Sequence, residues 1–174
     1  MKNRKAFVCV MCLCLLMLSI TSSLNAEDIS VAPPKLQAGL FVKLLEFNKG
    51  LASGGDISIY VMGSPEFAAA MKTGIGKAVG KARISAVTEG NNLPTDKPEV
   101  IYVGSASMTD TVIKYTRANH IISITGQPGQ VEKGVTLGVG VLAGKPRILL
   151  NLWSSKEEGI DWNPAILKIS TIIK

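Results

Sequence analysis

The chain has 174 residues, of which 47% are hydrophobic, 18% charged and 5% aromatic, and its formal net charge is +6. This composition is too apolar for a disordered chain, and the length suits one domain and excludes a membrane protein of many spans. All three cysteines lie close to the N-terminus.

The N-terminal segment is predicted to be a secretory signal peptide. Lys2, Arg4 and Lys5 precede an uncharged run at 6–20, and small and polar residues follow it up to Ala26. Such a peptide has this order of charged, apolar and cleavage regions. The apolar run is shorter than the ~20 residues that cross a bilayer. An uncleaved membrane anchor is the alternative.

We expect cleavage after Ala26, with cleavage after Ser23 as the alternative. This gives a signal peptide at 1–26 and one domain at 27–174. After cleavage, the domain is predicted to be located in the periplasm, without stable insertion into the membrane. Loss of the three basic residues of the leader lowers the net charge from +6 to +3, a weak basis for nucleic-acid binding, so no such partner is predicted. The mature domain has no cysteine and must fold without a disulfide.

The first element of the mature domain is predicted as a helix at 35–48. Its apolar residues recur at helical spacing: Leu36, Leu40, Phe41, Leu44, Leu45 and Phe47. The apolar face is wider than one core contact requires. Two interpretations stay open. Either the helix is buried on two sides of its own domain, or residues such as Phe41 also contact a partner or a second subunit.

Strands and helices alternate through the middle of the chain. A short helix at 65–71 is predicted, with Ser64 as its N-cap and Pro65 at its first position. Ser107 and Asp110 have the spacing of a capping box for a second helix. Loops are expected over 49–55 and 90–98, and apolar runs predict strands at 56–62, 82–87, 100–103 and 121–125.

These repeats predict an α/β fold, a three-layer αβα sandwich of Rossmann-like type with a mainly parallel sheet. The C-terminal part differs. Valine and leucine alternate with threonine and glycine over 135–141, which predicts a half-exposed strand, and a turn at 143–146 makes a hairpin with 147–152. A closing helix is expected after Asn163, with an inward stripe of Ala165, Ile166, Ile169, Ile172 and Ile173.

Residues for catalysis are sparse, and no catalytic residue, metal or cofactor is predicted. His120 is the only histidine and precedes a strand, a position typical of a structural role. Glu157 and Glu158 are adjacent and point in different directions on a helix, so they are weak metal ligands. The glycines of 74–80 miss the nucleotide-binding spacing and are interpreted as a helix end that turns into the next strand.

A small-molecule site is the alternative function. In a parallel sheet, loops at the carboxyl ends of the strands form a ligand crevice, and Ser64, Ser105, Ser107 and Gln127 lie in three such loops. Acidic residues in the first turns of the adjacent helices would oppose an anionic ligand.

Four segments together resemble the YfiR/HmsC family of exported bacterial proteins. They are PPKLQAGLFVKLLEF, ISIYVMGSPEF, EVIYVGSAS and the C-terminal GVTLGVGVLAGKPRILLNLWSSKEEGIDWNPAILKISTII. Two features depart from the family pattern. The aromatic-proline ending of the first helix is here Glu46-Phe47-Asn48, and the cysteines of some members are missing, so no redox control is carried over.

The resemblance implies a non-enzymatic, dimeric periplasmic protein that binds the periplasmic region of an inner-membrane diguanylate cyclase and represses it, which affects cyclic-di-GMP and biofilm formation. A histidine kinase is the alternative membrane partner. Trp153, Ile160 and Trp162 flank charged residues, as in an interface with an apolar centre and a polar rim, and are the candidate contacts. The competing interpretation packs both tryptophans under the last helix.

Overall fold

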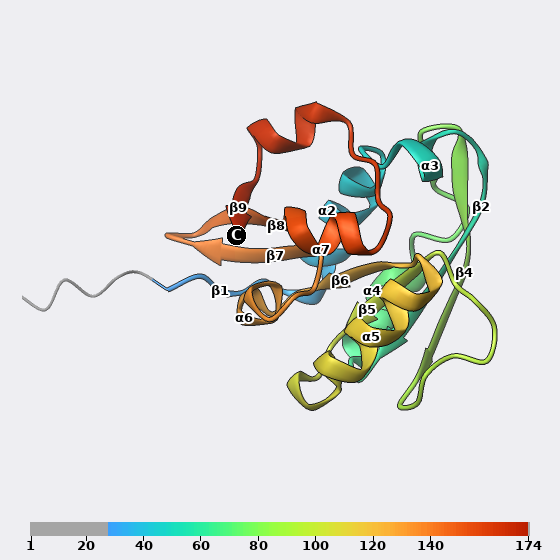
Figure 1. The fold of residues 1–174 in the computed structure, drawn as a ribbon, viewed down its shortest axis with the longest axis horizontal. Coiled ribbons are helices and arrows are strands. Elements are labelled where there is room, and N and C mark those ends of the chain that lie inside the picture. The colour runs from blue at the N-terminus through green and yellow to red at the C-terminus, as the bar shows by residue number, and fades with distance from the viewer. Residues whose placement is uncertain (1–27, 174) are drawn as a thin grey trace, which may run out of the picture.

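The computed structural model describes residues 28–173, which form one nine-stranded sheet (Figure 1). The order is β3-β4-β2-β5-β6-β7-β8-β9, and β1 pairs with β7. The strands are Ser30–Val31 (β1), Gly55–Met62 (β2), Ala78–Val79 (β3), Ala82–Gly90 (β4), Val100–Val103 (β5), Ile122–Thr125 (β6), Leu137–Leu142 (β7), Lys145–Asn151 (β8) and Thr171–Ile173 (β9). The α-helices are Pro34–Leu45 (α2), Lys49–Ala52 (α3), Pro65–Lys72 (α4), Thr109–Asn119 (α5), Pro128–Glu132 (α6) and Leu152–Glu157 (α7), with 3-10 turns at Ala106–Met108 (η2) and Pro164–Lys168 (η3).

The mainly parallel sheet predicted from the strand and helix repeats is confirmed. β2 pairs in parallel with β4 and β5, and β6 pairs in parallel with β5 and β7. β5 and β6 are buried along their whole length, as strands of a sheet covered on both faces are, and the buried residues of β6 include the polar Ser123 and Thr125. The predicted hairpin joins β7 to β8 through Ala143 and Gly144, both at positive φ, which is the two-residue turn that matches strand twist.

Helices cover both faces of the sheet. In Figure 1, α5 and α6 lie in front of the sheet, whereas α2 and α4 lie behind it. On the α2 and α4 face, Phe67 stacks on Tyr102 with ring centroids 3.7 Å apart, and Phe41 meets both rings edge-on. Phe41 is fully buried at the centre of this cluster. The predicted first helix therefore turns Phe41 into its own core, and the suggestion that Phe41 contacts a partner is wrong.

The expected half-exposed strand at 135–141 is instead buried on both faces. Leu137 and Val139 enter the α2 side, while Gly138 and Gly140 face the other side and are also buried. A Cβ atom at position 138 would overlap the Val131 side chain of α6. The alternating glycines therefore permit the close approach of a covering helix and do not mark solvent exposure.

The expected closing helix is also wrong. Asn163 does cap the segment, accepting a hydrogen bond of 3.0 Å from the Ala165 amide, but only the 3-10 turn η3 follows. The chain then forms β9, which pairs in parallel with β8, so Ile172 and Ile173 are half-buried and Ile169 is exposed. The β-branched run after Ile169 suits a strand, and the open edge of β8 supplies its partner.

Three local predictions are corrected at helix starts. Ser64 precedes α4 as expected, but its side chain makes no capping hydrogen bond. Ser107 lies inside η2 and α5 begins at Thr109, so Ser107 and Asp110 form no capping box. The expected loop at 49–55 contains the single turn α3, capped by the Asn48 side chain.

Replacing Phe41 by alanine is expected to lower the free energy of unfolding by about 4 kcal/mol, because a fully buried aromatic side chain leaves a cavity. Leu36→Ala is the matched control on the same helix, since Leu36 is 36% exposed, and should cost less than about 1 kcal/mol. Urea titration measures both. Equal losses in the two variants would contradict the assignment of Phe41 to the core.

Candidate functional site

The exposed apolar residues of α7 are placed by a helix cap. Asn151 ends β8, and its side-chain oxygen accepts a hydrogen bond of 2.9 Å from the Ser154 amide, while its amide nitrogen donates to the Val131 carbonyl. This cap starts a helix whose first two residues point outward. Leu152 is 42% exposed and Trp153 is 56% exposed, whereas Ser154 is buried.

Trp153 is held in place by a cation from another element. The guanidinium carbon of Arg117, in the last turn of α5, lies 4.4 Å from the centroid of the Trp153 ring. Attraction between a guanidinium group and the face of an indole is strongest where water is partly excluded. The contact orders a large exposed aromatic side chain, as a preformed binding anchor requires.

Next to α7 lies a shallow cavity of about 270 Å³ lined by Leu152, Ser155, Lys156, Ile160, Trp162, Pro164 and Leu167. Trp162 forms the buried wall: it is only 9% exposed, and its indole nitrogen donates to the Ser155 hydroxyl at 2.9 Å. Ile160 is half-buried and Leu167 is 43% exposed. We call Leu152, Trp153, Ile160, Trp162 and Leu167 the C-terminal apolar surface.

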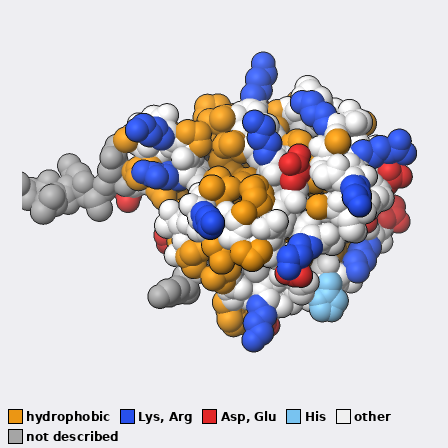
Figure 2. Space-filling view, turned by 90° about the horizontal axis from the view of Figure 1, so that it is seen from above, with side chains coloured by type: hydrophobic (Ala, Val, Ile, Leu, Met, Phe, Trp, Pro, Cys, Tyr) orange, Lys and Arg blue, Asp and Glu red, His pale blue; other side chains and the backbone are white. Residues whose placement is uncertain are grey.

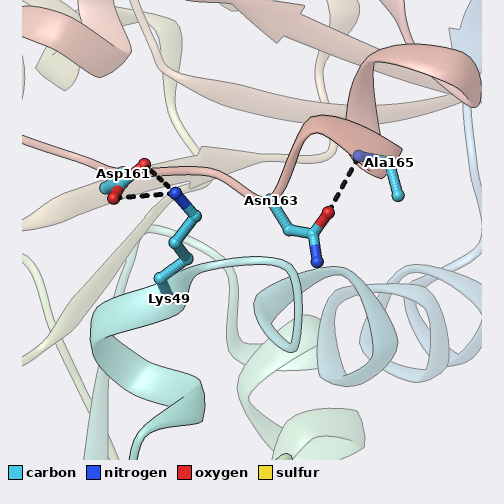
Figure 3. A network of polar contacts seen from close by, with 4 residues as sticks. All are labelled: Lys49, Asp161, Asn163 and Ala165. Atoms are coloured by element: carbon cyan, nitrogen blue, oxygen red, sulfur yellow. Dashed lines mark hydrogen bonds and ion pairs between the residues drawn. The ribbon is translucent and has the colours of Figure 1, made fainter.

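The loop that carries this surface is fastened to the N-terminal part of the chain (Figure 3). The Lys49 ammonium lies 3.0 Å from both carboxylate oxygens of Asp161, and the Lys49 amide donates to the Asp161 carbonyl. The backbone amide of Asn163 donates to the Phe47 carbonyl at 2.7 Å. Because the ion pair is exposed, the backbone bonds are the firmer part of this attachment.

Hydrophobic side chains gather on the face of the molecule that is uppermost in Figure 1, with lysine and arginine side chains around them, as Figure 2 shows. The structure brings Ile160 and Trp162 into one cavity and places Trp153 beside it on α7. Leu152, Leu167 and Arg117 were not among the residues predicted from the sequence. The Asn-Leu-Trp order of a capped helix start could have indicated Leu152, but no local pattern pairs Arg117 with Trp153.

The alternative ligand residues also come together. The loops after β2 and β5 touch, since a Cβ at position 104 would lie 2.6 Å from the Cβ of Ser64. The hydroxyls of Ser105 and Ser107 are hydrogen-bonded at 2.9 Å, and the Gln127 side chain donates to the Gly104 carbonyl. These polar groups bind one another, and a ligand there stays a prediction.

Residues 32–37, which lead into the first turn of α2, lie close to the carboxyl ends of the same strands. The Tyr102 hydroxyl donates to the side-chain oxygen of Gln37 at 2.8 Å, and the side-chain nitrogen Nε2 of Gln37 donates to the Ala32 carbonyl at 2.6 Å. Burial raises the pKa of Tyr102 to about 12, so its hydroxyl stays protonated. The chain leading into α2 is thereby tied to the centre of the sheet.

A buried carboxyl group holds the end of α7. Glu158 is fully buried, and its oxygens accept hydrogen bonds from the Thr116, Ser123 and Thr136 hydroxyls and from the Ser123 amide, at 2.6–3.0 Å. None of the ion pairs formed within residues 28–173 involves Glu158. Desolvation by burial raises its pKa above the ordinary value of 4.5 despite these donors. Glu157, by contrast, is exposed.

Groups for metal or acid–base chemistry are dispersed in the part of the chain that the structure describes. No three histidine, cysteine, aspartate or glutamate side chains gather there as a metal site would require. His120 is exposed and ends α5 in the left-handed conformation. The glycines of 74–80 link α4 through β3 to β4, as interpreted from their spacing.

The sequence comparison decides the family. The model for YfiR/HmsC-like proteins matches residues 35–171, which include the C-terminal apolar surface. The chain belongs to the YfiR/HmsC-like family. Members of this family are regulators and not enzymes, and they control diguanylate cyclases in the periplasm. No curated protein is significantly similar to this YfiR/HmsC-like chain.

Two solved structures are similar to this YfiR/HmsC-like chain in fold. A conserved domain protein of Vibrio cholerae has a TM-score of 0.57 and 16% identity over 83% of this chain and 61% of that one. The ABC domain of Streptococcus pneumoniae, in complex with L-Trp, has a TM-score of 0.50 and 14% identity over 82% and 62%. At such identities the likeness concerns the fold alone, and the chain spans about three fifths of either protein's length.

The predicted signal peptide at 1–26 lies outside the described residues. Within 28–173, every helix is too short or too polar to cross a bilayer.

Replacing Glu158 by alanine is expected to cost about 3 kcal/mol of unfolding free energy, because the buried Ser123 amide and three hydroxyls lose their acceptor. Glu157→Ala, at the exposed neighbour, should change it by at most about 0.5 kcal/mol. Urea unfolding compares the two variants. Similar costs would contradict the role assigned to the Glu158 carboxyl.

The pH dependence of stability should change in Glu158→Gln. A carboxyl whose pKa is raised by folding contributes stability below its ordinary pKa, and this contribution is lost as pH rises through the raised value. The wild-type chain should therefore lose stability relative to Glu158→Gln as pH rises above 4.5. Urea unfolding from about pH 4 to pH 8 tests this, and parallel curves would refute it.

The two tryptophans should differ in their effect on stability. Trp162→Ala is expected to cost about 3–5 kcal/mol, since it removes a buried ring and the bond to Ser155. Trp153→Ala should cost about 1 kcal/mol, the value of its contact with Arg117. Thermal and urea unfolding measure both. A larger cost at Trp153 would assign that ring to the core.

Proposed function

We propose that this chain is an exported periplasmic regulator that binds an inner-membrane diguanylate cyclase and represses it, so that cyclic-di-GMP and biofilm formation fall. Membership of the YfiR/HmsC-like family supports the class of function, because the family regulates such cyclases in general. A histidine kinase with a periplasmic segment is the alternative partner. The regulator is proposed to act as a homodimer, as the family resemblance implies.

The ordered, exposed Trp153 is the observation that carries the proposal. Trp153 is 56% exposed, so much of its apolar ring meets water. Its contact with Arg117 fixes the ring before any partner binds. Preordered aromatic anchors beside apolar pockets provide much of the affinity of protein interfaces. The adjacent cavity walled by Ile160 and Trp162 would receive an apolar side chain of the cyclase.

Repression by binding needs no reaction at this surface. If the regulator binds the inactive state of the cyclase more tightly than the active state, it shifts the population toward the inactive state by the difference in binding free energy. Lys156, which lines the same cavity, lies where the polar rim of such an interface is expected.

Deletion of the gene from its bacterium is expected to raise cyclic-di-GMP, measured by mass spectrometry, and biofilm mass. The wild-type gene should bring both back down to the original levels. Trp153→Ala should not, because loss of an interface anchor costs about 2 kcal/mol, or about thirtyfold in affinity. Binding is measured by interferometry on the periplasmic segments of that bacterium's membrane cyclases.

Lys145→Ala is the control, since Lys145 is exposed on the β7–β8 hairpin away from this surface, and it should restore repression. Immunoblots of the periplasmic fraction confirm equal amounts of each variant. Unchanged cyclic-di-GMP after deletion would disprove the proposed function. Full repression by Trp153→Ala would disprove the surface but not the function.

A further inference from the structure

A second apolar surface lies between α2 and α4. A groove of about 910 Å³ is lined by residues of both helices and of the segments that flank them. Its floor is made of Ala38, Gly39, Val42, Ala70 and Gly74. Small side chains on both helices leave this space open. It is more than three times the volume of the cavity beside Trp162.

The size of the groove suits a helix. A helical segment of about eight residues, with a diameter of about 10 Å and a rise of about 1.5 Å per residue, occupies about 900 Å³. The shorter wall, α4, has 8 residues, so a helix laid along the groove would contact its whole length. Glycine and alanine in the floor let a helix approach closely, and an amphipathic helix binds an apolar groove through the side chains of its apolar face.

The charges around the groove are mostly positive. Lys35 is in the first turn of α2, Lys43 in its last turn, and Lys77 follows α4, while Glu66 is the only acidic residue of the lining. A second copy docked groove to groove would bring six lysines together with two glutamates. Like charges juxtaposed in this way oppose self-association, and they favour an occupant with acidic flanks.

We propose that the α2–α4 groove is a docking site for an acidic amphipathic helix of a partner protein. The apolar stripe of that helix would lie on the small residues of the floor, and its aspartate or glutamate flanks would meet Lys35, Lys43 and Lys77. This goes beyond the proposed function, because it concerns a surface separate from Trp153 and does not require that the partner be a cyclase.

The test uses three fluorescein-labelled peptides of about 18 residues, long enough to span the groove as a helix. One carries a leucine and alanine stripe flanked by glutamate, the second has lysine in place of each glutamate, and the third is the acidic peptide with its helical spacing scrambled. Fluorescence anisotropy with the mature domain should give saturable binding of the acidic peptide. The other two should bind at least about tenfold more weakly.

Position 39 offers a matched pair of variants. A Cβ added at Gly39 meets nothing within 4 Å, so Gly39→Ala fits the fold, and the larger side chain of Gly39→Phe also begins in open space. Gly39→Phe fills the groove and should weaken binding of the acidic peptide at least about tenfold, while Gly39→Ala should leave it within about twofold. Thermal unfolding verifies that both variants are folded.

A second pair tests the charges. The double variant Lys43→Glu with Lys77→Glu should weaken the acidic peptide at least about tenfold at low salt. The control, Lys97→Glu with Lys145→Glu, makes the same change of net charge at exposed positions outside the groove lining and should leave binding within about twofold.

Three results would overturn the proposal. They are an acidic peptide that does not bind, equal binding of the basic or scrambled peptide, and binding that Gly39→Phe leaves unchanged.

Phosphatidylglycerol vesicles that bind through the groove in place of the peptides would assign it to lipid. Concentration-dependent dimerisation lost in Gly39→Phe would assign it to a second copy. Retained repression by Gly39→Phe in the cyclic-di-GMP assay would leave the proposed function standing, so the two failures are distinguishable.

Discussion

The carboxyl group of Glu158 joins four elements that the chain sequence keeps apart. It sits where α7 ends and accepts hydrogen bonds from Thr116 in the last turn of α5, from Ser123 in β6 and from Thr136, which immediately precedes β7. An unpaired carboxyl group is costly to bury, so it is tolerated only where such donors converge. Because these donors fix the position of Glu158, they also fix the position of α7, which ends immediately before this residue.

This constraint gives α7 its orientation. The helix is fixed at both ends, by the Asn151 side chain at its start and by Glu158 at its finish. Only one side of so short a helix can face the sheet, and the serines occupy it. Leu152 and Trp153 are thereby directed outward, and Arg117 of α5, which is brought near through the Thr116 contact, covers one face of the indole.

The sequence predicted the parallel sheet well, because a fully buried strand such as β5 is a continuous apolar run that indicates a strand without knowledge of its distant partners. It failed where a partner decides the structure. The isoleucines after Ile169 fit helical spacing as well as a strand, and only the open edge of β8 selects the strand. Gly138 and Gly140 suggested exposure, whereas the approach of α6 explains them.

The candidate site was predictable in composition but not in geometry. Ile160 and Trp162 were identified from apolar residues near charges, yet their spacing did not reveal that Trp162 is buried and Trp153 exposed. That difference arises from the Ser155 hydrogen bond and the Arg117 contact, which join residues on separate elements. Phe41 was misjudged because a wide apolar helix face looks the same whether a sheet or a partner covers it.

The pairing of β1 with β7 has a consequence for the order of folding. The Ser30 hydroxyl donates to the Val141 carbonyl, a residue 111 positions later in the chain. Since a ribosome makes the N-terminus first, β1 must wait for nearly the whole domain before its partner exists, and closing so long a loop is entropically costly. Only two residues of β1 pair. This strand is therefore the natural last piece to join during assembly and the first to detach when the domain begins to open.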